Sequence, residues 1–137
     1  MTCIAAYIDT DGTIYMGADS AGVSEYSIAK RKDPKVFING PMIIGFTSSF
    51  RMGQLLQYKL NIPEHPSNMD TMRYMVTVFV DAVRECLKEG GYASVSNNQE
   101  EGGTFLVGYK GRLFCIESDF QVGESVYNFD AVGCGRD

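Results

Sequence analysis

Apolar and polar positions alternate over short stretches toward both ends of the chain and follow a helical repeat in the middle. Residues 2–8 and 13–18 are rich in β-branched, aromatic and small apolar side chains. They flank Asp9-Thr10-Asp11-Gly12, a turn sequence in which Gly12 can take a positive φ. We therefore predict a β-hairpin. Antiparallel neighbours lie about 4.8 Å apart, so the end of the second strand should return beside the start of the first.

Other short apolar stretches are bounded by Gly, Pro and Asn, which is typical of strands joined by turns. Strands are expected over residues 35–38, 42–47, 104–109, 112–116, 125–127 and 129–132. The polar segment 23–29 is interpreted as a short extended arm, and the Gly-rich segment 92–103 as a loop.

The middle of the chain has the three-four apolar repeat of amphipathic helices. A first helix is expected after Ser48-Ser49, which can cap it, and should end before Pro63. A second is expected to begin near Ser67-Asn68-Met69-Asp70 and to stop at Gly90-Gly91. Its predicted apolar face comprises Met72, Met75, Val76, Phe79, Val80, Val83 and Leu87. Strands on both sides of a helical pair predict an α+β fold, with the helices on one sheet and the two sets of hairpins packed together.

Length and charge narrow the possible functions. The chain has 137 residues and a net charge of −5, which indicates a single domain over 1–137 and no nucleic-acid partner. It has no apolar run long enough for a membrane span and no signal-peptide pattern. Cys3, Cys86 and Cys115 lie in apolar patterns and are expected to be reduced, which fits a cytoplasmic location. No cysteine has metal-ligand spacing, and the lone His65 supports neither a zinc site nor a histidine-based triad, so no metal is expected.

Candidate chemistry begins at Thr2, which directly follows the initiator methionine. If Met1 is removed, Thr2 carries a hydroxyl and a free α-amine with a pKa of about 8. That amine can take the proton of the hydroxyl and activate it as a nucleophile. Asp19 follows the second strand on a small-residue loop and is expected near Thr2. A form that retains Met1, by contrast, should be inactive.

The order and spacing of these motifs resemble the proteasome β-subunit family and its bacterial peptidase relatives, within the N-terminal-nucleophile hydrolases. The matching positions are Thr2, Gly17-Ala18-Asp19-Ser20, Lys35-Val36, Gly45-Phe46-Thr47-Ser48-Ser49 and Gly133-Cys134-Gly135. The resemblance implies an αββα sandwich of two antiparallel sheets. The family continues with further helices and strands, so we expect the chain to be incomplete at its C-terminus and to lack the last helical layer.

The resemblance also implies a role for each matching residue. Thr2 would be the nucleophile and its α-amine the proton acceptor. Lys35 would lower the proton affinity of the Thr2 hydroxyl and stabilise developing negative charge, and Asp19 would pair with Lys35. Cys134 stands where the family has a serine near the amine and would help to relay protons. The alternatives are a solvent-facing lysine at a strand end for Lys35 and a turn-capping carboxylate for Asp19.

The turn Thr47-Ser48-Ser49 would supply a backbone N–H to the tetrahedral oxyanion, helped by the N-terminus of the following helix. The family usually has glycines here. A backbone donor survives replacement of glycine by Ser48 and Ser49, although a substrate then has less room to approach. Phe46 or Thr47 would line the pocket for the residue before the scissile bond.

These roles imply a threonine endopeptidase, a subunit of a self-compartmentalising protease that hydrolyses peptide bonds. Its partners would be a peptide or unfolded protein substrate, further copies of the chain in a ring, and an ATP-driven unfoldase. No metal or organic cofactor is implied. Two alternatives are an N-terminal-nucleophile amidohydrolase acting on a small amide, and a catalytically silent structural ring subunit. Cys3 is a weaker nucleophile candidate, because removal of Met1 exposes Thr2 and strand alternation places Cys3 on the opposite face.

Overall fold

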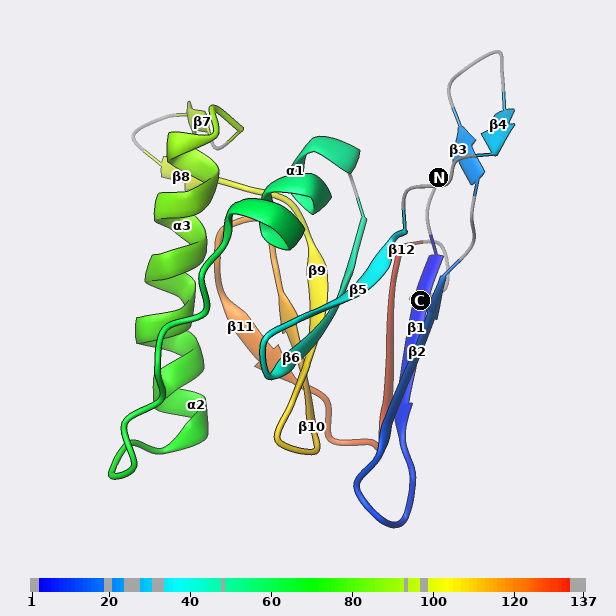
Figure 1. The fold of residues 1–137 in the computed structure, drawn as a ribbon, viewed down its shortest axis with the longest axis vertical. Helices are drawn as coiled ribbons and strands as arrows, with labels where there is room; N and C mark the ends of the chain where they lie inside the picture. The colour runs from blue at the N-terminus through cyan, green and yellow to red at the C-terminus, as the bar shows by residue number, and fades with distance from the viewer. Residues whose placement is uncertain are drawn as a thin grey trace.

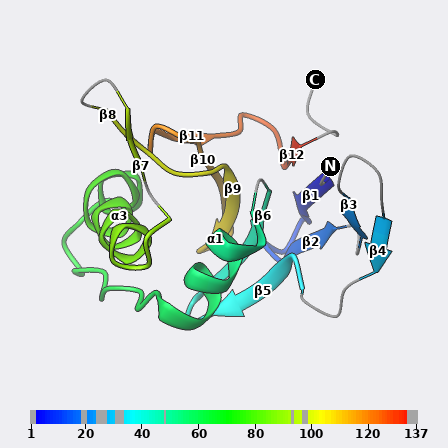
Figure 2. The same cartoon turned by 90° about the horizontal axis from the view of Figure 1, so that it is seen from above.

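The computed structural model describes residues 3–18, 21–23, 28–30, 34–47, 49–92, 94–96 and 99–133. Two antiparallel sheets face each other, and the helices cover the far side of one of them (Figure 1). Figure 2 shows the helices on the opposite side of the larger sheet from β1 and β2. This helix–sheet–sheet order confirms the predicted layering. Within the described residues, no helix covers the outer face of the smaller sheet, and none is long and apolar enough to cross a membrane.

The smaller sheet has the order β12-β1-β2. Its strands are β1 (Cys3–Ile8), β2 (Ile14–Ala18) and β12 (Phe129–Gly133). The turn between β1 and β2 is held by the Asp9 carboxylate, which accepts hydrogen bonds from the backbone N–H groups of Asp11 and Thr13. Gly12 has φ +86°, a conformation that glycine adopts without strain. The predicted first hairpin is therefore confirmed.

The larger sheet has the order β11-β10-β9-β6-β5. Its strands are β5 (Val36–Asn39), β6 (Met42–Phe46), β9 (Phe105–Tyr109), β10 (Arg112–Ile116) and β11 (Val122–Glu124). The strand predicted over 125–127 is wrong. There Ser125 Oγ accepts from the Tyr127 N–H and donates to the Phe129 carbonyl. These bonds form a turn between β11 and β12.

Two short hairpins occupy segments interpreted from the sequence as an arm and a loop. They are β3 (Ala21–Val23) with β4 (Ile28–Lys30), and β7 (Ser94–Ser96) with β8 (Gln99–Glu101). These short segments have no regular apolar alternation from which strands could be predicted.

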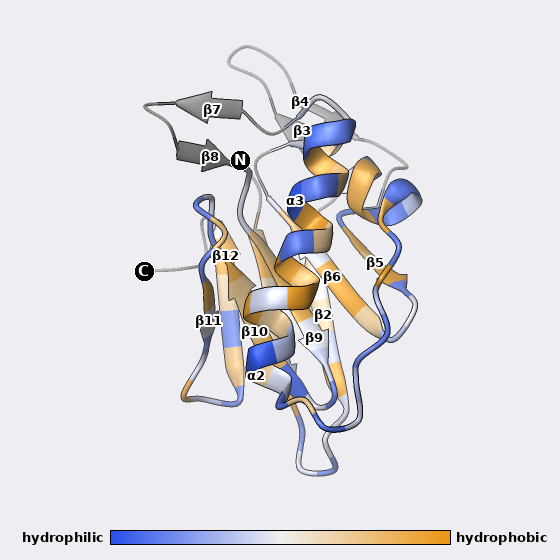
Figure 3. Ribbon diagram, turned by 90° about the vertical axis from the view of Figure 1, so that its left-hand side faces the viewer, coloured by the Kyte–Doolittle hydropathy of each residue, from blue (hydrophilic) through white to orange (hydrophobic). Residues whose placement is uncertain are grey.

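Both predicted helices are present, and each contains a π-helical segment. The first comprises α1 (Phe50–Gln54) and η1 (Leu55–Lys59); the second comprises α2 (Thr71–Tyr74), η2 (Met75–Phe79) and α3 (Val80–Glu89). Hydrophobic and hydrophilic bands alternate along α3 (Figure 3), so one face packs inward. Val76, predicted to be on that face, is 44% exposed. It lies in η2, where the wider π-helical turn changes the helical phase.

Strand alternation divides the core into two clusters. On β9, Phe105 and Val107 belong to the cluster under the helices, whereas Leu106 belongs to the cluster between the sheets. The buried residues between the sheets are Ile4, Ala6, Leu106, Leu113, Cys115 and Val132. The sheets approach closely at Gly45 and Gly108, where an added Cβ would lie 2.6 Å from a methyl group of Ile4 on β1 and 3.0 Å from methyl groups of Ile14 on β2, respectively.

The outer face of the smaller sheet carries a row of aromatic side chains. Tyr7 lies opposite Tyr15 on one side and Phe129 on the other. All three are exposed, and the Tyr7 and Tyr15 rings stack with their centroids 4.9 Å apart.

Candidate functional site

The predicted site residues divide into two groups. Those outside the described residues are Thr2, Asp19, Ser48 and Cys134. Those that the structure describes are Lys35, Phe46, Thr47 and Ser49.

Strand register determines which backbone segments meet at the end of the smaller sheet. Cys3 at the start of β1 pairs with Gly133 at the end of β12, and Ile4 pairs with Ala18 at the end of β2. The positions adjacent to these strand ends in sequence are those predicted as nucleophile, carboxylate and proton relay. The start of β1 and the ends of β2 and β12 therefore lie together, and each is next in sequence to one of these predicted residues.

The cysteines differ from expectation at one position. Cys86 and Cys115 are buried and reduced, as expected, whereas Cys3 is disulfide-bonded. The expectation of a reduced Cys3 is wrong, because this residue lies at the sheet end where several chain segments meet rather than within a closed apolar core. A sulfur held in a disulfide is not a thiolate, so Cys3 cannot act as a nucleophile in this state.

Lys35 is buried, with an exposed fraction of 3%. It directly precedes β5, and its carbonyl accepts a hydrogen bond from the backbone N–H of Phe46 on β6, at 3.0 Å. Its ammonium lies 5.7 Å from the ring centroid of Phe50. Lysine is almost never buried without a compensating contact. The alternative of a solvent-facing lysine at a strand end therefore does not hold.

The turn after β6 is attached to the start of β9 through Thr47. Both the backbone N–H and the hydroxyl of this buried residue donate to the Thr104 carbonyl, at 3.1 and 2.9 Å. The Ser49 N–H in turn donates to the Thr47 carbonyl, at 2.8 Å. The N–H groups of Thr47 and Ser49 are thus both engaged in hydrogen bonds.

Ser49 caps the helix that follows. Its hydroxyl accepts from the backbone N–H groups of Arg51 and Met52, at 3.0 and 3.3 Å. This is the N-cap arrangement predicted from the Ser48-Ser49 pair. It fixes the point at which the chain leaves the turn and enters α1.

Phe46, predicted as a pocket residue, is buried between the sheet and the helices. Its ring contacts Phe50 edge-on, with centroids 5.8 Å apart, and leaves no room for a side chain at Gly53. It helps to line a cavity of about 20 Å³, together with Pro34, Phe50, Gly53, Gln54, Gln57 and Tyr58. That volume holds about one water molecule. Sequence reasoning missed Phe50, although an aromatic residue at the start of a helix after two serines was a usable signal.

His65 has a structural environment. Its Nε2–H donates to the Met69 carbonyl at 2.7 Å, because a carbonyl can only accept, and its Nδ1 accepts from the Tyr109 hydroxyl at 2.8 Å. The ring also stacks on Tyr74, with centroids 4.4 Å apart. His65 thus attaches the loop between the two helices to β9.

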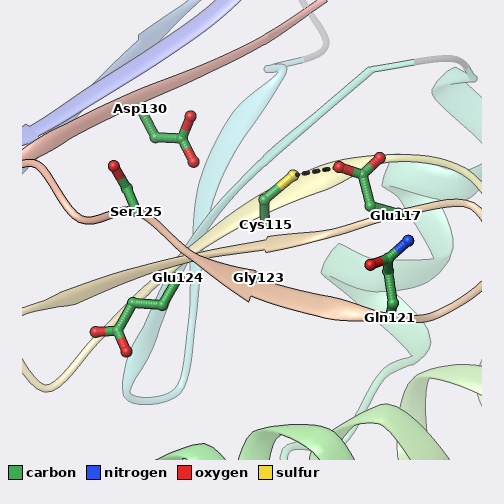
Figure 4. A pocket seen from close by; sticks show the side chains of 7 residues that line it. All are labelled: Cys115, Glu117, Gln121, Gly123, Glu124, Ser125 and Asp130. Carbon is green, nitrogen blue, oxygen red and sulfur yellow. Dashed lines mark hydrogen bonds between the residues drawn. The ribbon is translucent and has the colours of Figure 1, made fainter.

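A separate cavity of about 240 Å³ opens between β10, β11 and β12 (Figure 4). Its lining residues are Cys115, Glu117, Gln121, Gly123, Glu124, Ser125 and Asp130. Cys115 Sγ donates to Glu117 at 3.4 Å. This cavity contains none of the predicted site residues. In the part of the chain that the structure describes, no group of three or more His, Cys, Asp or Glu side chains could hold a metal ion.

The sequence matches no protein-family model and no curated protein, whereas several solved structures share the fold. BPH from Thiobacillus denitrificans, in complex with epoxomicin, has a TM-score of 0.72 at 18% identity, covering 98% of this chain and 73% of its own. The helical assembly of the Anbu complex from Pseudomonas aeruginosa gives a TM-score of 0.57 at 16% identity, covering 98% and 61%. HslV from Trypanosoma brucei gives 0.55 at 17%, covering 98% and 72%. The chain therefore has a proteasome-like peptidase fold, which confirms the predicted αββα fold of the N-terminal-nucleophile hydrolase type.

Proposed function

We propose that this chain is a threonine-type peptidase subunit of a proteasome-like protease, with Thr2 as the nucleophile after removal of Met1. The observation that carries the proposal is Lys35. A lysine expected to stand behind the nucleophile is 97% buried in a fold of the matching class. Lys35 directly precedes β5, and β5 is hydrogen-bonded to β6, the strand that leads into the predicted oxyanion turn.

In the proposed reaction, the Thr2 hydroxyl oxygen bonds to the carbonyl carbon of a peptide bond while its proton passes to the α-amine. Collapse of the tetrahedral adduct breaks the carbon–nitrogen bond, and the proton goes to the leaving amine. Water then cleaves the ester on Thr2, which restores the hydroxyl and releases the carboxylic acid. Both steps need only proton transfers that the α-amine can make in either direction.

The other predicted residues support these steps. The Lys35 ammonium stabilises negative charge on the Thr2 oxygen, and Asp19 holds that ammonium in place. The backbone of the turn at Ser48 donates to the oxyanion. Cys134 is the proposed relay beside the amine in the form of the protein in which the disulfide at Cys3 is reduced; a thiol is a weaker hydrogen-bonding partner than a serine hydroxyl.

Substrate and assembly follow the same proposal. The substrate is a peptide or unfolded protein, and the chain assembles with copies of itself in a ring that an ATP-driven unfoldase supplies, in the cytoplasm. Two solved structures with this fold provide support, because BPH binds epoxomicin and Anbu forms a helical assembly.

The proposal is tested by peptide hydrolysis together with particle mass. We expect Thr2→Ala and Lys35→Met to abolish cleavage of fluorogenic peptides, Thr2→Ser to retain it, and light scattering to report an oligomer. Cleavage of small amides by a monomer would favour the amidohydrolase. An oligomer with no activity, unchanged by Thr2→Ala, would favour the structural subunit.

A further inference from the structure

We infer that Phe50 is a positioning residue for Lys35, and that the face of its ring holds the lysine ammonium at the proposed active site. The ammonium lies 5.7 Å from the ring centroid, inside the roughly 6 Å range of cation–π attraction. Lys35 is only 3% exposed, and the attraction is strongest when water is excluded from the cation.

The Phe50 ring is itself held in place. It meets the ring of Phe46 at 5.8 Å in an edge-to-face arrangement, and Phe46 meets Phe37 at 6.3 Å. Phe46 and Phe37 are buried in the core under the helices. The backbone of Phe50 is fixed by the N-cap at Ser49. The ring therefore forms a pre-organised surface.

The backbone connects this surface directly to the lysine. Phe46 donates its N–H to the Lys35 carbonyl at 3.0 Å, so the residue that supports the ring also pairs with the residue that carries the cation. The distance between ring and ammonium thus depends on two adjacent strands and one short turn. A displacement of α1 would move the ring relative to the lysine.

The chemistry explains why an aromatic face suits this position. A lysine carries its charge on a flexible four-carbon chain, so a second contact reduces the number of positions that the ammonium can occupy. A ring face attracts the cation through its quadrupole. A carboxylate at this position would accept hydrogen bonds from the N–H groups of the Lys35 ammonium. The ring leaves these N–H groups to Asp19 and Thr2, as the proposed mechanism requires. The catalytic consequence of this inference rests on the proposed function.

The test replaces Phe50 by phenylalanine analogues with one, two, three and five fluorines, which nearly preserve shape and progressively weaken the ring quadrupole. The readout is the rate constant for covalent modification of Thr2 by epoxomicin, followed by intact mass. We expect a stepwise fall, about fivefold or more from phenylalanine to pentafluorophenylalanine. Phe50→Tyr should retain the rate and Phe50→Leu should lose it. Equal rates across the fluorinated series would overturn the inference.

A second measurement separates this inference from the proposed function. A double-mutant cycle of Lys35→Met and Phe50→Leu, read by urea unfolding, measures the contact without any catalysis. Coupling in the cycle together with a fluorine-dependent rate supports the inference. Additive single mutants overturn it, even if Thr2 reacts normally. Coupling in a wild-type protein whose Thr2 forms no adduct overturns the proposed function and with it the catalytic role of Phe50.

Discussion

Gly45 on β6 should not tolerate a side chain, because the facing sheet leaves no space for one. A Cβ at this position would lie 2.6 Å from the Cγ2 methyl of Ile4, 2.8 Å from the sulfur of Met16 and 3.4 Å from a Val36 methyl. Ile4 is fully buried on β1, so its methyl cannot move into solvent. Gly45→Ala must therefore push the two sheets apart or force Ile4 out of its preferred rotamer.

The expected cost follows from two opposing effects. An extra methyl in a closely packed core costs about 1–3 kcal/mol. Replacing glycine also removes conformational freedom from the unfolded chain. Where the backbone conformation suits alanine, this effect stabilises the folded state by about 0.4–1 kcal/mol. Gly45 does not have a positive φ, so this second effect applies. We expect Gly45→Ala to lower the free energy of unfolding by about 1–2 kcal/mol.

The assay is urea unfolding of the wild type, Gly45→Ala and a matched control, Gly17→Ala. Gly17 lies on β2, and a Cβ there would have no atom within 4 Å, so the control should be neutral or slightly stabilising. Adding Ile4→Ala to Gly45→Ala removes the contacting methyl, so the double variant should lose less than the two single changes predict together. A Gly45→Ala protein as stable as the control would refute the described packing of the two sheets.

Three further predictions concern single contacts and use urea unfolding as the readout. Thr47→Val should cost about 1 kcal/mol, because it removes the hydroxyl bond to the Thr104 carbonyl; Thr47→Ser, which keeps that bond, should cost less. The bidentate bond from Arg112 lowers the pKa of the Glu124 carboxyl. Its stabilisation should be complete above the ordinary value of 4.5 and lost as the pH falls through the lowered pKa, so Glu124→Gln should cost about 0.5–1 kcal/mol at neutral pH and nothing in strong acid. Burial raises the pKa of Tyr74 from 10.0 to about 12. Wild-type stability should therefore fall relative to Tyr74→Phe as the pH rises through that range, because the unfolded phenol ionises first. A constant difference from wild type across the relevant pH range would contradict either titration.

Local sequence signals predicted the elements that are bounded by their own turn or capping residues. The first hairpin depends on the Asp9 carboxylate and on Gly12, the two ends of a four-residue turn whose chemistry can be predicted without tertiary context. Both helices begin within the capping segments named from the sequence, Ser48-Ser49 and Ser67-Asn68-Met69-Asp70. Ser49 and Asp70 each accept backbone N–H groups of the first turn. Such caps need no information from the rest of the fold.

The segments assigned wrongly from the sequence lack a local pattern that identifies their structure. Val126 belongs to an apolar stretch yet is 90% exposed, because the chain turns there to move from one sheet to the other. The short strands β3 and β7 have only a local hairpin partner and no apolar alternation. Hydrophobic patterning alone could not distinguish these segments from loops.

In the candidate site, too, local features could be predicted from the sequence, whereas features that depend on tertiary packing could not. The position of Lys35 at the start of a strand could be predicted, because Val36-Phe37-Ile38 is a compact apolar run. Its burial and its position 5.7 Å from the Phe50 ring centroid could not, since both depend on how distant segments pack around it. The disulfide at Cys3 was equally inaccessible, because an apolar strand pattern does not show which chain segments meet at a sheet end.

Intact-mass spectrometry before and after treatment with epoxomicin measures whether Thr2 is a free N-terminal nucleophile. We expect a protein that has lost Met1 and gains the mass of one inhibitor, mapped by peptide analysis to Thr2 and absent from Thr2→Ala. A protein that keeps Met1 and gains no inhibitor would refute the assignment of Thr2 as nucleophile and favour a structural subunit.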